Sequence, residues 1–292
     1  MRYACYLWGG LRHVGRLSDD GTELTPLALG DRAREVGVAA LVEHLAAGGA
    51  MPAAQGTRLP LTAVTLEAPF PRPRRNLFCV GKNYHEHAKE FAASGFDTSR
   101  SPGQDVPEHP IIFSKVPECV IAPGATIRLP RGVSDAIDYE AELAVVIGRG
   151  GRGIRKSRAM EHVWGATIVN DVTARDWQSR HKQWHMGKSF DTFCPMGPFA
   201  ADTDSVDPAA TRVRCWINDE LRQDASTRDL IFDIPTLIET ISAGITLYPG
   251  DIICTGTPAG VGIGFTPPKY LQAGDRVRIE IDGIGVLGNG VA

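Results

Sequence analysis

The 292-residue sequence contains no apolar run long enough to cross a lipid bilayer, which takes about 20 residues in a helix. The start of the chain, MRYACYLWGG, also lacks the longer apolar run that a secretory signal needs. We therefore expect a soluble cytoplasmic protein with no membrane partner.

Basic residues form no long cluster, and the formal net charge is only −3. The densest basic stretch, at 72–75, is short and interrupted by proline, which is more typical of a solvated linker than of a phosphate-binding patch. This balance argues against nucleic acid as the main partner.

Cysteine pairs of the C-x-x-C type are absent. A chain of this size rarely needs a disulfide framework, and no zinc site of paired thiolates is visible. The cysteines are therefore interpreted as small core residues. They are Cys5, Cys79, Cys119, Cys194, Cys215 and Cys254.

Glycine (32) and proline (20) are abundant and separate many short apolar runs, which predicts a β-rich α+β fold with few long helices. Three prolines between 68 and 75 favour an extended linker. We therefore expect a small N-terminal domain at 1–70 and a catalytic domain at 75–292. Strands are expected at 76–80, 142–147, 166–169, 251–254 and 276–286, helices at 39–45, 84–91 and 234–243, and a mobile loop at 92–109.

The strongest local feature is a pair of glutamates at the start of an apolar strand. Glu140 and Glu142 precede Leu-Ala-Val-Val-Ile, and residues two apart on a strand point to the same side. Two buried carboxylates repel each other, so both stay ionised only around a cation, or one keeps a proton. If Asp171, which ends the next apolar strand, lies on a neighbouring strand, three hard oxygen ligands converge. Such a set suits Mg²⁺ or Mn²⁺ better than Zn²⁺; the alternative is a solvated strand edge and a turn residue.

A second candidate is the pair His87 and Glu90, three residues apart and so on one face of a helix. A carboxylate beside a histidine raises its basicity and fixes its tautomer, which makes a general base for water. A surface ion pair is the alternative. His85 and His87 would lie on different faces of that helix, so at most one of them faces a given pocket.

Other motifs carry weaker signals. Gly148–Gly153 fits G-x-G-x-x-G, but no regular alternation of strands and helices surrounds it, so an exposed turn is favoured over dinucleotide binding. His181 and His185 have the spacing of helical metal ligands without a third ligand nearby. Thr255–Gly262 lacks the lysine of a nucleotide P-loop, yet its amides and hydroxyls can hold a carboxylate; a tight turn is the alternative.

Five segments, taken in order, resemble the fumarylacetoacetate hydrolase superfamily, above all the branch with acylpyruvate hydrolases and oxaloacetate-acting members. The resemblance runs from about Arg75 to the C-terminus, and the earlier stretch is similar to the small N-terminal domain of many bacterial members. The matching segments are Cys79–Glu90, Asp138–Glu142, Asn170–Gln178, Gly187–Asp191 and Thr255–Gly262.

This resemblance implies a mixed β-roll of the family's C-terminal type, flanked by short helices and usually found as a homodimer. It also implies that Glu140, Glu142 and Asp171 are metal ligands. The expected ion is Mg²⁺, for which Mn²⁺ or Ca²⁺ can substitute.

By the same resemblance, His87 and Glu90 match a catalytic dyad on a lid that closes over the substrate. Lys188 matches a pocket lysine that supplies positive charge to a developing oxyanion or enolate. The positions that match substrate contacts are Arg175, Gln178 and Thr257.

The expected activity is hydrolysis of a carbon–carbon bond in an acylpyruvate-type β-diketo acid such as fumarylpyruvate. The ion would polarise the 2-oxo acid while the dyad activates a water for attack on the distal carbonyl. The alternative is an isomerase, tautomerase or decarboxylase acting on a 2-oxo dicarboxylic acid such as oxaloacetate or 2-hydroxyhepta-2,4-diene-1,7-dioate, since the same enolate serves these reactions.

Two hypotheses from other classes were considered. A non-catalytic metabolite-binding protein predicts the loss of a metal ligand or of the dyad, and neither is missing. An NAD-dependent oxidoreductase predicts nicotinamide binding through Gly148–Gly153, which a fluorescence titration can exclude.

Overall fold

The computed structural model describes residues 1–95 and 106–292. The strands are β1 (Arg2–Trp8), β2 (Leu11–Leu17), β3 (Glu23–Pro26), β4 (Leu59–Pro60), β5 (Thr65–Glu67), β6 (Leu77–Gly81), β7 (Ile111–Lys115), β8 (Val120–Ile121), β9 (Ile137–Asp138), β10 (Ala141–Ile147), β11 (Val163–Asn170), β12 (Thr173–Ala174), β13 (Cys194–Asp202), β14 (Arg212–Ile217), β15 (Glu220–Ser226), β16 (Ile252–Cys254), β17 (Arg276–Ile281) and β18 (Gly285–Gly290). The α-helices are α1 (Gly30–Val36), α2 (Ala39–Ala46), α3 (His85–Ala93), α4 (Arg175–Arg180), α5 (His185–Lys188) and α6 (Ile234–Ser242).

Most strands belong to one mixed sheet of 12 strands, whose main path runs β4-β3-β2-β1-β13-β11-β10-β16-β6-β7. A second sheet, β15-β14-β17-β18, has four strands, and β9 pairs with β12 in a small third one. The predicted β-rich α+β fold is therefore confirmed.

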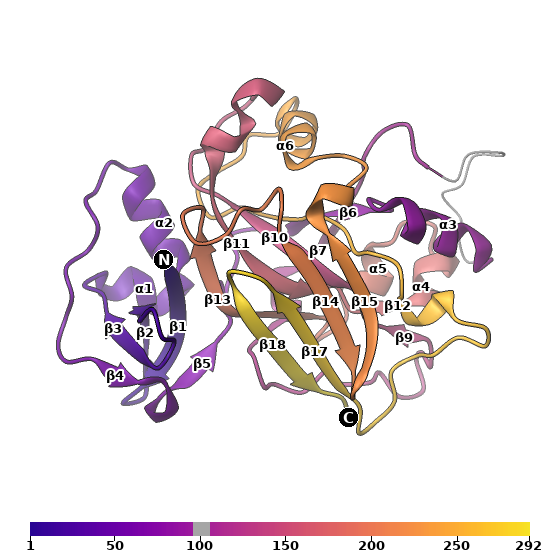
Figure 1. Ribbon diagram of the computed structural model, residues 1–292, viewed down its shortest axis with the longest axis horizontal. Coiled ribbons are helices and arrows are strands. Elements are labelled where there is room, and N and C mark those ends of the chain that lie inside the picture. Colours follow the sequence, from indigo (N-terminus) through magenta and orange to yellow (C-terminus); the bar gives the residue numbers. More distant parts are fainter. Residues whose placement is uncertain (96–105) are drawn as a thin grey trace.

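Residues 1–67 form one end of the molecule, and α3, α4 and α5 lie at the other end (Figure 1). The first strand is nevertheless paired with the rest of the chain: in β1, Arg2 and Tyr3 lie opposite Ala201 and Ala200 of β13. The proposed domain division at 70–75 stays a prediction, since the large sheet runs through it without a break.

β10 lies inside the large sheet and is buried along its whole length, because both of its faces are covered. Leu143 and Val145 pack with Val213 and Ile279 of the four-stranded sheet. The alternate residues, such as Val146, pack on the other side with residues of α2. Burial on both faces explains why this strand reads as a near-continuous apolar run.

Several other predicted elements are also present in the structure. The expected strands at 76–80 and 166–169 correspond to β6 and β11, and the expected helix at 84–91 corresponds to α3. The loop expected at 92–109 includes residues 96–105, which lie outside the described residues. Within the described ranges, no helix combines the length and the apolar character needed to cross a bilayer.

Candidate active site

Strand pairing brings the three predicted metal ligands together. β10 and β11 are antiparallel neighbours with Ala141 opposite Asn170, and the backbone NH of Asp171 donates to the carbonyl of Glu140 at 2.8 Å. One carboxylate oxygen from each of Glu140, Glu142 and Asp171 lies within 4.8 Å of the other two. All three side chains are buried, so their charges are poorly screened by water.

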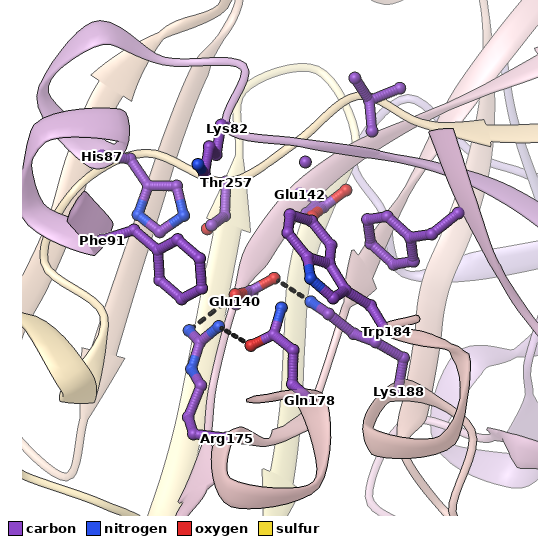
Figure 2. A pocket seen from close by; sticks show the side chains of 13 residues that line it. Lys82, His87, Phe91, Glu140, Glu142, Arg175, Gln178, Trp184, Lys188 and Thr257 are labelled. Carbon is purple, nitrogen blue, oxygen red and sulfur yellow. Dashed lines mark hydrogen bonds and ion pairs between the residues drawn. The ribbon is translucent and has the colours of Figure 1, made fainter. Parts of the chain in front are cut away.

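Two cationic side chains surround Glu140. Nζ of Lys188 lies 2.6 Å from Glu140 Oε2 and 2.8 Å from Asp171 Oδ2. Nη2 of Arg175 lies 2.6 Å from Glu140 Oε1, as Figure 2 shows. Burial alone would raise the pKa of Glu140, but the Lys188 and Arg175 charges outweigh it and lower that pKa to about 2.

Glu142 has a different environment. Burial raises its pKa well above the ordinary value, and the neighbouring Asp171 and Glu140 carboxylates raise it further. The backbone NH of Gly256 donates to Glu142 Oε2 at 2.9 Å, so the side chain is held in place. A divalent cation between the three carboxylates would favour the ionised form of Glu142. The all-oxygen donor set fits Mg²⁺ or Mn²⁺.

Behind the triad lies Lys115, which the sequence analysis did not single out. Its fully buried ammonium donates to Asp171 Oδ1 at 2.7 Å, to the Val172 carbonyl at 3.1 Å, and to the Lys188 carbonyl. Burial would lower its pKa, but Asp171 and two buried thiols raise it above the ordinary value. Lys115 therefore connects a predicted metal ligand to the segment that carries Lys188.

The predicted dyad lies on α3. His87 is buried and its Nδ1 is 3.2 Å from Glu90 Oε2, whereas His85 is exposed, as expected for one pocket-facing histidine. Glu90 also accepts from the backbone NH of Gly260 at 3.0 Å. Phe91 anchors the helix by packing against Val261, Ile263 and the Trp184 ring. Nδ1 is thus engaged by Glu90, which leaves Nε2 for proton transfer in the pocket.

The predicted substrate contacts line the same cavity, which opens between the triad and α3. Arg175 donates to Asp138 Oδ2 at 2.8 Å and to Gln178 Oε1 at 3.2 Å. Thr257 accepts from Gln223 Nε2 at 2.7 Å. The cavity measures about 10 Å³, room for roughly one water molecule, so a substrate enters only if part of the wall moves.

Lys82 and Asp138 lie within the matching sequence segments but were not predicted as site residues. Lys82 lines the cavity close to His87 and Thr257 (Figure 2). Asp138 accepts from the backbone NH groups of Gly262 and Ile263 at 2.6 and 3.0 Å, besides its pair with Arg175. Asp138 thus holds the predicted substrate loop and Arg175 together, a role that its place in the Asp-Tyr-Glu-Ala-Glu motif could have suggested.

Of the weaker motifs, only the Thr255–Gly262 loop contributes to the cavity wall among the described residues, through Thr257. Gly148–Gly153 forms a turn after β10, and Gly151 bridges to Leu247 in the sheet-like contact that closes it. His185 is partly buried and its Nδ1 contacts the Ser114 backbone carbonyl at 3.1 Å. Among the described residues, only the carboxylate triad groups three potential metal ligands.

Comparison with known proteins gives a consistent picture. Residues 76–292 match the family model described as fumarylacetoacetate (FAA) hydrolase, C-terminal. The chain is 51% identical over 230 residues to the oxaloacetate tautomerase YisK of Bacillus subtilis, covering 78% of this chain and 73% of the relative. It is 45% identical over 242 residues to the human mitochondrial oxaloacetate tautomerase FAHD2A, covering 82% and 73%.

Solved structures agree with the fold. A fumarylacetoacetate hydrolase from Exiguobacterium antarcticum superposes with a TM-score of 0.82 at 38% identity, covering 100% of this chain and 99% of that one. A maleylpyruvate hydrolase from Sphingobium sp. SYK-6, solved with manganese(II) and pyruvate, superposes with a TM-score of 0.75 at 29% identity, covering 100% and 99%. The expected β-roll of the family is therefore confirmed.

The predicted carbon–carbon hydrolase activity is wrong. The relatives at 51% and 45% identity are tautomerases, and they are more similar to this chain than the hydrolases are. The physical reason is that the predicted triad and the predicted base would serve hydrolysis and tautomerisation alike, so the residues on which the hydrolase expectation rested do not separate the two reactions.

The family model, the relatives and the solved structures agree. The chain is an enzyme that belongs to the fumarylacetoacetate hydrolase family.

Proposed function

We propose that this enzyme interconverts the keto and enol forms of oxaloacetate with the help of Mg²⁺. The observation that carries the proposal is the 51% identity to a bacterial oxaloacetate tautomerase over 230 residues, 78% of this chain. The geometry supports it, because a general base faces a site for a divalent ion across a small cavity.

Glu140, Glu142 and Asp171 would hold the ion. Bound there, Mg²⁺ acts as a Lewis acid on the 2-oxo group and lowers the cost of negative charge on its oxygen. Mn²⁺, which is bound in the maleylpyruvate hydrolase structure, and Ca²⁺ are the expected substitutes.

The reaction moves one proton from C3 of the substrate to the oxygen on C2. The C3–H bond breaks, an O–H bond forms, and the double bond moves from C2=O to C2=C3. His87 is positioned to take the C3 proton at Nε2, since its Nδ1 is held by Glu90. Lys188, whose pKa is raised above the ordinary value by Asp171 and Glu140 against the lowering effect of burial, keeps a positive charge where the oxygen becomes negative.

The remaining wall residues orient the substrate. Thr257, whose side chain lines the cavity, is placed to donate its hydroxyl to the carboxylate of the 2-oxo acid. Arg175 and Gln178 lie on α4 and hydrogen bond to each other, so they present one fixed polar surface. We also propose that the protein works as a homodimer, as the family resemblance implies.

The test is a direct assay of tautomerisation. Oxaloacetate dissolved as its enol in a dry solvent is diluted into buffer, and the decay of the enol ultraviolet absorbance is followed with enzyme plus Mg²⁺ and with enzyme plus EDTA. We expect faster decay only with Mg²⁺, and no pyruvate by a lactate dehydrogenase assay. An unchanged decay rate contradicts the proposal, and pyruvate formed at the rate of decay indicates a decarboxylase.

A further inference from the structure

Lys82 has an unusual backbone for a lysine. Its φ angle is 54°, in the left-handed region that residues other than Gly, Asn and Asp rarely adopt. It connects the end of β6 to the start of α3, the helix of the dyad. Strained residues of this kind cluster at functional sites, where the surrounding structure holds them.

The neighbours on both sides hold this conformation. A Cβ on Gly81 would lie 2.1 Å from the Trp184 ring, so the backbone passes too close to that ring for a side chain at position 81. The fully buried Asn83 side chain donates to the backbone carbonyls of Phe232 and Thr255 at 3.0 and 2.8 Å and accepts from the Phe232 NH at 2.7 Å. The backbone at Lys82 is therefore fixed in space.

This backbone directs the Lys82 side chain into the cavity. The residue is 4% exposed, lines the cavity wall, and has Nζ 5.6 Å from the centre of the Phe91 ring. Figure 2 shows it beside His87 and Thr257, on the far side of the cavity from Lys188.

Among the described residues, the two other cations that line the cavity contact carboxylates at the triad end. Arg175 pairs with Asp138 and Glu140. Lys188 pairs with Glu140 and Asp171. Both therefore act at the triad end of the cavity, and Lys82 is the cation at the dyad end.

The chemistry of the proposed substrate places its second carboxylate at that end. In a four-carbon 2-oxo dicarboxylate, C3 is bonded to both C2 and the distal carboxylate carbon. A base that takes the C3 proton therefore lies next to the distal carboxylate, and Lys82 lines the wall beside that base.

We propose that Lys82 recognises the distal carboxylate of a four-carbon 2-oxo dicarboxylate and so selects these acids over 2-oxo monocarboxylates. This inference rests on the proposed function, since it takes His87 as the base. A charge-assisted hydrogen bond from a buried ammonium to a carboxylate gives both affinity and selectivity.

The test compares two ligands by calorimetry in the presence of Mg²⁺. The first is 3,3-difluoro-oxaloacetate, which has both carboxylates and cannot enolise. The second is oxalate, which offers only the chelating half. Lys82→Met should weaken binding of difluoro-oxaloacetate by roughly ten- to a hundredfold, the value of a lost charged hydrogen bond, and should change oxalate binding by less than about twofold.

Matched variants separate charge from fold. Lys82→Asn removes the charge with a residue that tolerates the left-handed backbone, and it should reproduce the selective loss. Lys89→Met removes the charge of an exposed lysine on α3 and should leave the binding of both ligands unchanged. Equal weakening of both ligands by Lys82→Met and Lys82→Asn, or no weakening of either, overturns the inference.

The outcome is separable from that of the proposed function. If Lys82→Met selectively weakens binding of difluoro-oxaloacetate but the enzyme does not tautomerise oxaloacetate, Lys82 recognises the dicarboxylate and the proposed tautomerase function is wrong. Tautomerase activity whose KM for oxaloacetate is unchanged in Lys82→Met, with no selective loss of binding, keeps the function and refutes the role of Lys82.

Discussion

The carboxylate triad and the His87–Glu90 pair face each other across one cavity, yet they are built differently. The triad lies at the ends of paired strands in the interior of the large sheet and is bound by buried cations. The pair lies on a nine-residue helix beyond β6, near the edge of that sheet, and the Glu90 side chain remains 15% exposed. The half predicted to bind the ion is part of the core, whereas the half predicted to move protons is attached to its surface.

This difference explains how one family supports hydrolysis, isomerisation and tautomerisation. The core half fixes what these reactions share, which is the binding of a 2-oxo acid. The comparison predicts that damage to each half gives a distinct result.

The largest effect is expected from Glu142→Ala. It removes the carboxylate at the centre of the triad, so Mg²⁺ binding should fall below detection by calorimetry and turnover should match wild-type enzyme in EDTA. Full activity of this variant in EDTA would remove the basis for the metal site.

His87→Ala should separate the two halves. We expect kcat to fall by about 10² to 10⁴, the usual worth of a general base, while Mg²⁺ affinity stays within about twofold of wild type. His85→Ala, on the exposed face of the same helix, is the control and should behave as wild type. A parallel loss of metal affinity in His87→Ala would show that the halves are not independent.

Lys115→Met tests how far the core half depends on its buried support. Asp171 would lose an ammonium at 2.7 Å, and the Lys188 carbonyl would lose a donor. We expect Mg²⁺ affinity to fall by about 10- to 100-fold, as for other residues that orient metal ligands. The free energy of unfolding should fall by at most about 3–5 kcal/mol, because buried Asp171 loses one of its two ammonium partners and keeps Lys188. An unchanged affinity in the folded variant would limit Lys115 to stability.

Gly264→Ala should affect the helix half alone. The new Cβ would lie 1.8 Å from Glu90 Oε1, so the carboxylate must move away from His87. We expect a several-fold decrease in kcat with unchanged Mg²⁺ affinity. Gly288→Ala adds the same methyl group in open space and serves as the control. Equal activity of the two variants would argue against a working His87–Glu90 pair.

The smallest effect is a pH dependence of metal-free stability. Burial and two neighbouring carboxylates raise the pKa of folded Glu142 above the ordinary value of 4.5. Below that value both folded and unfolded chains carry the proton; above it the unfolded chain ionises first, so stability falls as pH rises through the raised pKa. Urea unfolding in EDTA should show this loss in wild type relative to Glu142→Gln, and saturating Mg²⁺ should abolish it. Parallel curves in EDTA would exclude Glu142 as its source.

The triad could be predicted from sequence because its signal is local. The two-residue spacing of Glu140 and Glu142 fixes a common side of a strand, and only the neighbouring position of Asp171 had to be assumed. The same holds for His87 and Glu90, three apart on a helix. Their mutual arrangement was supplied by the family resemblance rather than by spacing.

Lys115 and Lys82 could not be chosen in this way. Lys115 ends a strand at the sheet edge, where a lysine usually faces water, and its burial depends on contacts with residues 171–188, far away in the chain. Lys82 owes its direction to a left-handed backbone that is held by Trp184 and Asn83, and neither contact leaves a pattern in the sequence. The reaction type could not be predicted for a related reason, since it depends on the shape of the cavity.

The pairing of β1 with β13 has a practical consequence. A fragment beginning at residue 76, where the family match starts, would lack the partner that covers part of β13. Unpaired NH and carbonyl groups on such an edge are a template for other chains, and edge-to-edge association is how exposed strands aggregate. The N-terminal strands therefore act as a protective cap for the large sheet, and shortened forms of this enzyme should be assessed by light scattering before their kinetics are interpreted.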